Sequence, residues 1–283
     1  MLGVSCLPCV TPRSATTAWC AGPQHGSAAD ARSHAPPTRR DPRSPESPQA
    51  PPAPAAVPRT ARQEVHDAAP ALGWYTDSLL YHEVWNRAGL AKRDRSLVTL
   101  AALIADGRTA QLRSHIRRAL ENGVRPVEVV ELVTHLAFFT GWPTAMSALP
   151  VMTEVFDDQG VDARGIRQAA VPENATAGRK CDAEGGAGPF TSCLHEAMPA
   201  STIAELWHRA GLSARDRSLA TVAALVALGE RDELVRYSQR ARHDGVRLTE
   251  LCEAIAHLAF YVGVAQAAAT ATVLDESLVT KRD

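Results

Sequence analysis

The stretch ELVTHLAFFTGWP (residues 131–143) places a glutamate and a histidine four residues apart in an otherwise apolar run. The stretch EAIAHLAFYVGVA (residues 253–265) repeats this Glu-x-x-x-His spacing. Residues four apart share one face of an α-helix, so both runs predict a buried helix that carries a carboxyl group and an imidazole on one side. The two runs diverge after the histidine, because GWP in the first run is replaced by GVA in the second.

The two runs belong to a longer internal repeat. The first copy reads EVWNRAGLAKRDRSLVTLAALIADG (83–107) and the second reads ELWHRAGLSARDRSLATVAALVALG (205–229). The match continues without a gap, at a constant offset of 122 residues, from 112–141 to 234–263. Such self-similarity indicates two copies of one structural unit. We expect a disordered tail at 1–68, a first repeat at 69–157, a linker at 158–198 and a second repeat at 199–283.

Composition and charge limit the classes of function. The chain has 283 residues, of which 45% are hydrophobic, and its formal net charge is −1. It therefore holds enough apolar residues for a core and lacks the basic excess typical of proteins that bind nucleic acid. No apolar run approaches the roughly 18 residues of a membrane span. With no recognisable secretory leader, we expect a cytoplasmic protein. The lone pair Cys6 and Cys9 has no second pair that would complete a zinc site.

Each repeat reads as a series of helices. Leu97, Leu100 and Ile104 follow one helix face. Ser213 is placed as an N-cap and Gly123 as the residue that ends a helix. Pro126 suits the first position of the next helix. No strand-like alternation appears, so the sequence predicts an all-α fold.

A proline is expected to disturb the last helix of the first repeat. That helix follows Gly141 and contains Pro150. A proline inside a helix removes one backbone hydrogen bond, so we expect a kink or an early end at this position.

The Glu-x-x-x-His pair of the first repeat is a candidate for acid–base chemistry. Burial would raise the pKa of the Glu131 carboxyl and lower that of the His135 imidazole, which is how a general acid or base is brought near neutral pH. The alternative is a buried polar pair that fixes helix packing. The recurrence of the pair as Glu253 and His257 favours this structural role as much as the catalytic one.

His115 differs between the copies, because its counterpart is Tyr237. In the second copy, Val264 and Ala265 stand in place of Trp142 and Pro143. This asymmetry favours one working site in the first repeat, although a lone helical histidine can also be a solvated surface residue. The charged run RDRS (93–96) is expected to pair with carboxylates at a helix start, and one of its arginines could instead hold a substrate carboxylate.

These features together resemble the carboxymuconolactone decarboxylase family. The resemblance rests on the Trp-x-Arg-x-Gly-Leu lead-in, the Arg-Asp-Arg-Ser helix start, the histidine in LRSH, the ENG helix end, the Glu-x-x-x-His pair and the Phe-x-Gly-Trp-Pro segment. It covers 79–156 closely and about 201–276 more loosely. The related alkylhydroperoxidase-D-like enzymes carry a Cys-x-x-Cys after the glutamate. Here those positions are Pro143 and Met146, and Ala265 and Ala268 in the second copy, so a thiol peroxidase is disfavoured.

The resemblance implies an alkylhydroperoxidase-D-like helical unit, present twice, that assembles without a cofactor or metal. Two fused units would form a six-unit ring from three chains, so we expect a homotrimer. The implied function is a cofactor-independent lyase that decarboxylates a small cyclic or aromatic-derived acid. An isomerase or cyclase, or a non-catalytic oligomeric binding protein, are the alternatives.

Decarboxylation requires a stabilised oxyanion and a delivered proton. We expect His115 and His135 to supply these, with Glu131 orienting His135. Phe139 and Trp142 are expected to wall an apolar pocket. The last candidates are the arginines expected to bind a carboxylate of the small-molecule substrate, Arg113 and Arg95.

Overall fold

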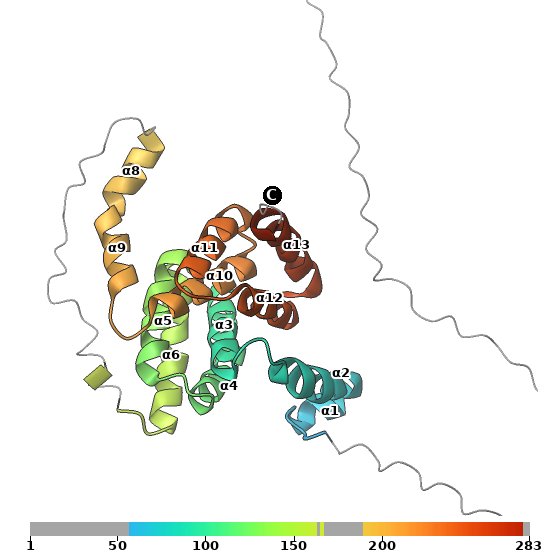
Figure 1. Ribbon diagram of the computed structural model, residues 1–283. Helices are drawn as coiled ribbons and strands as arrows, with labels where there is room; N and C mark the ends of the chain where they lie inside the picture. The colour runs from blue at the N-terminus through green and yellow to red at the C-terminus, as the bar shows by residue number, and fades with distance from the viewer. Residues whose placement is uncertain (1–56, 163–164, 167–188, 280–283) are drawn as a thin grey trace, which may run out of the picture. The chain divides into compact units, whose positions relative to one another are not determined.

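The computed structural model describes residues 57–162, 165–166 and 189–279 (Figure 1). All regular elements among these residues are helical, as the sequence predicted. The expected tail and first repeat contain α1 (Gln63–Ala68), α2 (Pro70–Tyr75), η1 (Thr76–Glu83), η2 (Val84–Asn86), α3 (Lys92–Ala105), α4 (Thr109–Glu121), α5 (Pro126–Thr140) and α6 (Trp142–Asp158). The expected linker and second repeat contain α8 (Pro189–Ala197), α9 (Ala200–His208), α10 (Ala214–Leu228), α11 (Arg231–His243), α12 (Leu248–Val262), α13 (Val264–Leu274) and η3 (Asp275–Val279).

The helix boundaries follow the local signals in the sequence. The side chain of Ser213 accepts a hydrogen bond from the backbone N–H of Asp216 at the start of α10. Gly123 follows α4 with a φ of +90°, a conformation that glycine adopts without strain. Pro126 is the first residue of α5. The expectation that Pro150 shortens the last helix was wrong, because α6 continues through it to Asp158.

The two repeats exchange contacts through their central helices. Helices α3 and α10 pack against each other and are buried along most of their length. Helix α12 of the second repeat packs on α3, and α5 of the first repeat packs on α10. Figure 1 shows these four helices gathered at the middle of the folded part. The Glu-x-x-x-His helix of each repeat therefore lies against the central helix of the other repeat.

One apolar core runs through both repeats. Its central members include Leu97, Leu100 and Leu219, which are fully buried. Burial of each such side chain contributes about 1.5–3 kcal/mol, so joining the two cores stabilises units that would be marginal alone. In the part of the chain that the structure describes, no helix is long and apolar enough to cross a membrane.

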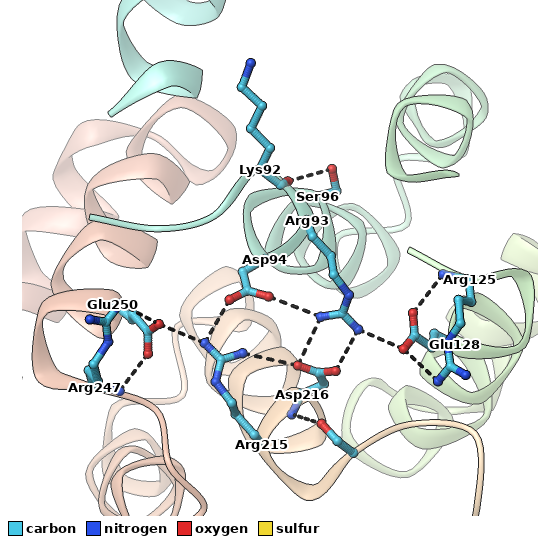
Figure 2. Close-up of polar contacts among 11 residues, drawn as sticks. Lys92, Arg93, Asp94, Ser96, Arg125, Glu128, Arg215, Asp216, Arg247 and Glu250 are labelled. Atoms are coloured by element: carbon cyan, nitrogen blue, oxygen red, sulfur yellow. Dashed lines mark hydrogen bonds and ion pairs between the residues drawn. The ribbon is translucent and has the colours of Figure 1, made fainter. Parts of the chain in front are cut away.

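The charged run at the start of each central helix joins the repeats (Figure 2). The guanidinium of Arg93 lies 2.8 Å from the carboxylate of Asp216, and that of Arg215 lies 2.8 Å from Asp94. The two contacts are equivalent under the exchange of the repeats. This arrangement agrees with the expectation that the RDRS arginines pair with carboxylates. The outer members of the same network are Arg125 and Glu128, and Arg247 and Glu250.

The expected bounds of the tail and the linker stay predictions, and two helices lie within them. Residues 1–56 of the expected tail lie outside the described residues. The last part of the expected tail forms α1, and the backbone N–H groups of Thr60 and Ala61 donate to Asp77 Oδ1 at 2.7 and 2.6 Å. Helix α8 lies within the expected linker, of which 163–164 and 167–188 are outside the described residues.

Candidate active site

Each Glu-x-x-x-His glutamate is bound by arginines of the other repeat. Glu131 lies 2.7 Å from Arg209 and 3.0 Å from Arg217, and both Glu131 and Arg217 are buried. A buried carboxylate needs such partners because its desolvation is costly. Glu131 therefore belongs to an ion-pair group that ties α5 to α10. No hydrogen bond between Glu131 and His135 exists among the described residues.

Glu253 occupies the equivalent position in the second repeat. Arg87 binds it with two hydrogen bonds of 2.8 and 2.5 Å, and Arg95 donates to it at 3.1 Å. These guanidinium partners, Arg87 first, lower the pKa of Glu253 to about 2. Arg95, one of the predicted carboxylate ligands, is thus used inside the protein.

The Trp-x-Arg-x-Gly-Leu motif explains why the glutamates are recognised across repeats. In its first copy, Arg87 holds Glu253, and Gly89 packs so closely that an added Cβ would lie 2.3 Å from the Glu253 Cγ. In the second copy, Arg209 and Gly211 play the same parts for Glu131. The motif is therefore a docking element for the glutamate of the opposite repeat.

The histidines are also held across repeats. His257 Nε2 lies 2.8 Å from Thr99 Oγ1, and His135 Nε2 lies 2.8 Å from Thr221 Oγ1. The Thr99 hydroxyl donates its only proton to the Arg95 carbonyl, so it must accept from Nε2–H of His257. The Thr221 hydroxyl does the same for His135. Both imidazoles are therefore the Nε2–H tautomer, and neither Nδ1 has a hydrogen-bond partner among the described residues.

His115 lies in an aromatic cluster with the second repeat's histidine. Its ring stacks on Trp85, with centroids 6.2 Å apart, and meets Tyr261 edge-on at 5.4 Å. His257 lies 5.0 Å from Trp85 and 5.1 Å from Tyr261. We call this group the His115 cluster; its members are Trp85, Thr99, His115, Arg118, His257 and Tyr261.

The equivalent group on the other side has different chemistry. Tyr237 replaces His115 and stacks on Trp207 at 6.1 Å. Phe139 replaces Tyr261 and lies 4.8 Å from His135 and 5.3 Å from Tyr237. We call this group the Tyr237 cluster; its members are His135, Phe139, Trp207, Thr221, Tyr237 and Arg240.

Burial keeps the histidines of both clusters neutral. It lowers the pKa of His115 to about 4, with a smaller contribution from the positive charge of Arg118. It lowers the pKa of His135 and of His257 to about 3, to which Arg217 and Arg95 respectively add. Burial also raises the pKa of Tyr261, so its hydroxyl keeps its proton. The His115 cluster thus offers neutral donors and acceptors at physiological pH.

The structure divides the predicted site residues between the two clusters. His115 belongs to one, and His135 and Phe139 belong to the other. Trp142 is 55% exposed and touches Phe138 rather than either cluster. Arg113 pairs with carboxylates of α6 on the surface. The catalytic and binding roles of these residues remain predictions, but they do not form one group within the first repeat.

Sequence reasoning missed the partners that the second repeat supplies. His257 and Tyr261 were visible as counterparts of His135 and Phe139, and Trp85 and Arg118 stand in matched motifs. The missing information was which helix of one repeat packs on which helix of the other. No spacing within one repeat encodes this. Among the residues that the structure describes, no group of three or more His, Cys, Asp or Glu side chains is placed to hold a metal ion.

Comparisons with known proteins identify the family. A family model described as the carboxymuconolactone decarboxylase family matches residues 70–154 and 195–276. The chain is similar to the 4-carboxymuconolactone decarboxylase of Acinetobacter baylyi, with 44% identity over 79 residues, which are 28% of this chain and 59% of the relative. It is also similar to the nitrosuccinic acid decarboxylase of Metarhizium robertsii, with 37% identity over 75 residues, 26% of this chain and 52% of the relative.

A third relative has no stated function. It is an uncharacterised 15.0 kDa protein of Paracoccus denitrificans, with 31% identity over 81 residues, 28% of this chain and 60% of the relative. The chain spans roughly half to three fifths of the length of these curated relatives. The two regions matched by the family model make up more than half of the chain, and the protein therefore belongs to the carboxymuconolactone decarboxylase family.

Proposed function

We propose that the protein is a cofactor-independent lyase that decarboxylates a small cyclic or aromatic-derived acid at the His115 cluster. The observation that carries this proposal is the meeting of His115 and Tyr261 in one cluster, where the other cluster has Tyr237 and Phe139. Two of the relatives are named as decarboxylases, which supports the reaction class.

The protein must supply two groups for the reaction. The bond between the carboxylate and its carbon breaks, carbon dioxide leaves, and the electron pair moves into a conjugated carbonyl, whose oxygen becomes an oxyanion. That carbon then takes one proton. The first group is a hydrogen-bond donor for the oxyanion, and the second is a proton donor for the carbon.

Tyr261 is suited to be the hydrogen-bond donor for the oxyanion. Its hydroxyl accepts a hydrogen bond from Trp85 Nε1–H at 3.1 Å and also lies beside the Thr99 side chain. In the proposed mechanism the hydroxyl turns its proton from Thr99 to a substrate oxygen. Because burial raises the pKa of Tyr261, the hydroxyl remains a donor at neutral pH. Phe139, at the equivalent position of the Tyr237 cluster, has no such group.

His115 is suited to be the proton donor for the carbon. Its pKa is lowered by burial and by Arg118, and a bound substrate carboxylate would offset the positive charge. The imidazole would take up a proton from solvent only transiently, and would give it to the carbon after carbon dioxide leaves. His257 is held by Thr99 and acts as a positioning residue for Tyr261, which it contacts at 5.1 Å.

The same reasoning assigns a different role to the predicted pair Glu131 and His135. Glu131 is occupied by Arg209 and Arg217, and His135 by Thr221. We propose that both support the joint between the repeats, and that the Tyr237 cluster is a copy of the site that has lost the proton donor.

We also propose that three chains assemble into a ring. Trp142 and Met146 expose an apolar face on α6, and Phe138 of α5 packs against Trp142. The second repeat exposes Phe260 and Val264 at the equivalent places. One chain therefore presents the same kind of face twice, which suits head-to-tail contacts that close into a ring.

The function is tested by incubating the purified protein with a panel of unsaturated lactone acids and following the products by mass spectrometry. The proposal predicts the loss of one carbon dioxide from at least one acid, without added metal or cofactor. A product of unchanged mass would identify an isomerase or cyclase instead. No change in any acid, together with saturable binding, would contradict the proposal and favour a binding protein.

A further inference from the structure

Arg118 is a cation without a counter-ion in the His115 cluster. Its guanidinium carbon lies 4.2 Å above the ring centroid of Tyr81 and 5.4 Å from that of Trp85. None of the carboxylates in the described residues forms an ion pair with it. The Arg118 side chain is half-buried. Its guanidinium nitrogens are not among the buried polar atoms that lack a hydrogen-bond partner, so a ligand can reach them.

The equivalent arginine of the Tyr237 cluster is paired. The guanidinium carbon of Arg240 lies 3.6 Å from the ring centroid of Trp207, and its Nε lies 3.3 Å from Asp244 Oδ2. In the first repeat, the place of Asp244 is taken by Asn122. The Asn122 amide donates to Ser96 Oγ at 2.9 Å and carries no charge to offset that of Arg118.

The exchange of Asn for Asp changes little else. Asn122 ends α4 with φ −83° and ψ 5°, and Asp244 ends α11 with φ −78° and ψ 6°. Ser218 donates to Asp244 as its counterpart Ser96 accepts from Asn122. The backbone and the serine therefore accommodate either residue, and the exchange decides whether the arginine above the aromatic ring is free.

We propose that Arg118 binds a carboxylate of the substrate that is retained in the product, and that Asn122 keeps Arg118 free for this purpose. The inference rests on the proposed decarboxylation. A cation that bound the departing carboxylate would stabilise the ground state more than the transition state, in which that negative charge disappears. The anchored group is therefore a second carboxylate, which the reaction leaves in place.

The anchor also links binding to the chemical step. Arg118 contributes to the low pKa of His115, and a carboxylate bound to Arg118 would remove that contribution. The pKa of His115 would then rise, while burial, the larger cause, would continue to lower it. Arg113 and Arg95, the arginines expected from the sequence, are already occupied by Glu154 and Glu253.

The test is isothermal titration calorimetry with glutaconate, a stable unsaturated dicarboxylate, against the full chain and four variants. Arg118→Gln and Asn122→Asp should each weaken binding at least about tenfold, since a charge-assisted hydrogen bond is lost. Asn122→Asp keeps Arg118 and copies a residue that the other repeat already holds. The matched controls Arg240→Gln and Asp244→Glu alter the paired arginine and its carboxylate partner, and should leave binding at the His115 cluster unchanged.

Three results would overturn the anchor: no saturable binding to the unaltered chain, equal binding in Arg118→Gln, or an equal loss in Arg240→Gln. Each leaves the decarboxylase proposal standing, because that proposal is tested by release of carbon dioxide. If binding follows Arg118 but no acid is decarboxylated, the anchor stands and the proposed function fails.

Discussion

Trp85 of the first repeat donates a hydrogen bond from Nε1 to the hydroxyl of Tyr261 in the second repeat at 3.1 Å. The two residues are 176 positions apart in sequence. The bond fixes the phenol beside His115, which lies 5.4 Å from it between ring centroids. The candidate active site is thus a property of the fused pair of repeats, and neither repeat alone contains it.

Removal of the Tyr261 hydroxyl should slow the chemical step with little effect on folding. Phe139 occupies the equivalent position in the other cluster, so a phenylalanine fits there. Tyr261→Phe removes the proposed oxyanion donor, and we expect kcat to fall by about 10²–10³-fold. Steady-state kinetics with a substrate from the panel would measure the change, and circular dichroism would check the fold. An unchanged kcat would remove Tyr261 from the mechanism.

The buried ion pair of Glu131 should matter for stability. Glu131→Gln leaves the guanidinium of Arg217, which is fully buried, without its carboxylate. We expect a loss of about 3–5 kcal/mol in the free energy of unfolding, measured by urea denaturation. Arg113→Ala breaks an exposed pair between α4 and α6 and should cost less than about 1 kcal/mol. Similar losses in the two variants would show that Glu131 is not buried as described.

The free energy of unfolding should fall as the pH drops below about 6.5, where an ordinary histidine takes up a proton. His135 and His257 have a pKa of about 3 in the folded protein, against an ordinary value of 6.5. Below pH 6.5 the unfolded chain therefore binds protons that the folded protein does not, which favours unfolding. Each such histidine contributes up to about 1.4 kcal/mol per pH unit.

The check on this pH dependence is the slope of the unfolding free energy between pH 6.5 and 5, where carboxylates contribute little. His257→Gln should reduce that slope, because one buried imidazole is removed. An identical slope in the unaltered chain and His257→Gln would mean that His257 is not buried in its neutral form.

The proposed ring should depend on the exposed apolar faces. Light scattering of the unaltered chain is expected to give about three times 30.2 kDa. The double variant Trp142→Glu with Val264→Glu places charge on both faces and should reduce the mass to that of one chain. Trp74→Glu changes an exposed aromatic residue of α2 and serves as the control. A monomeric unaltered chain at micromolar concentration would contradict the ring.

Much of the fold could be predicted from the sequence because its signals are local. Ser213, Gly123 and Pro126 act through the backbone within a few residues, and each stands where its chemistry predicted. The repeat and its resemblance to a family added the fold class. Pro150 does not end α6, because a helix supported by its neighbours tolerates one lost hydrogen bond.

The site was predicted less well because its assembly is not local. His115 and His135 are both in the first repeat, yet they belong to different clusters. Packing of α5 on α10 and of α12 on α3 carries each Glu-x-x-x-His pair across to the other repeat. The asymmetry between His115 and Tyr237 was readable from the sequence, but the partners of His115 were not.

The most direct test of the account compares two variants at equivalent positions, His115→Gln and Tyr237→Phe, by the kcat/KM for release of carbon dioxide. The account places the proton donor in one cluster only, so His115→Gln should lower kcat/KM by about 10²–10⁴-fold. Tyr237→Phe should leave it within a factor of about two, because that cluster carries no part of the reaction. An equal loss in both variants, or full activity in His115→Gln, would contradict a single active site at the His115 cluster.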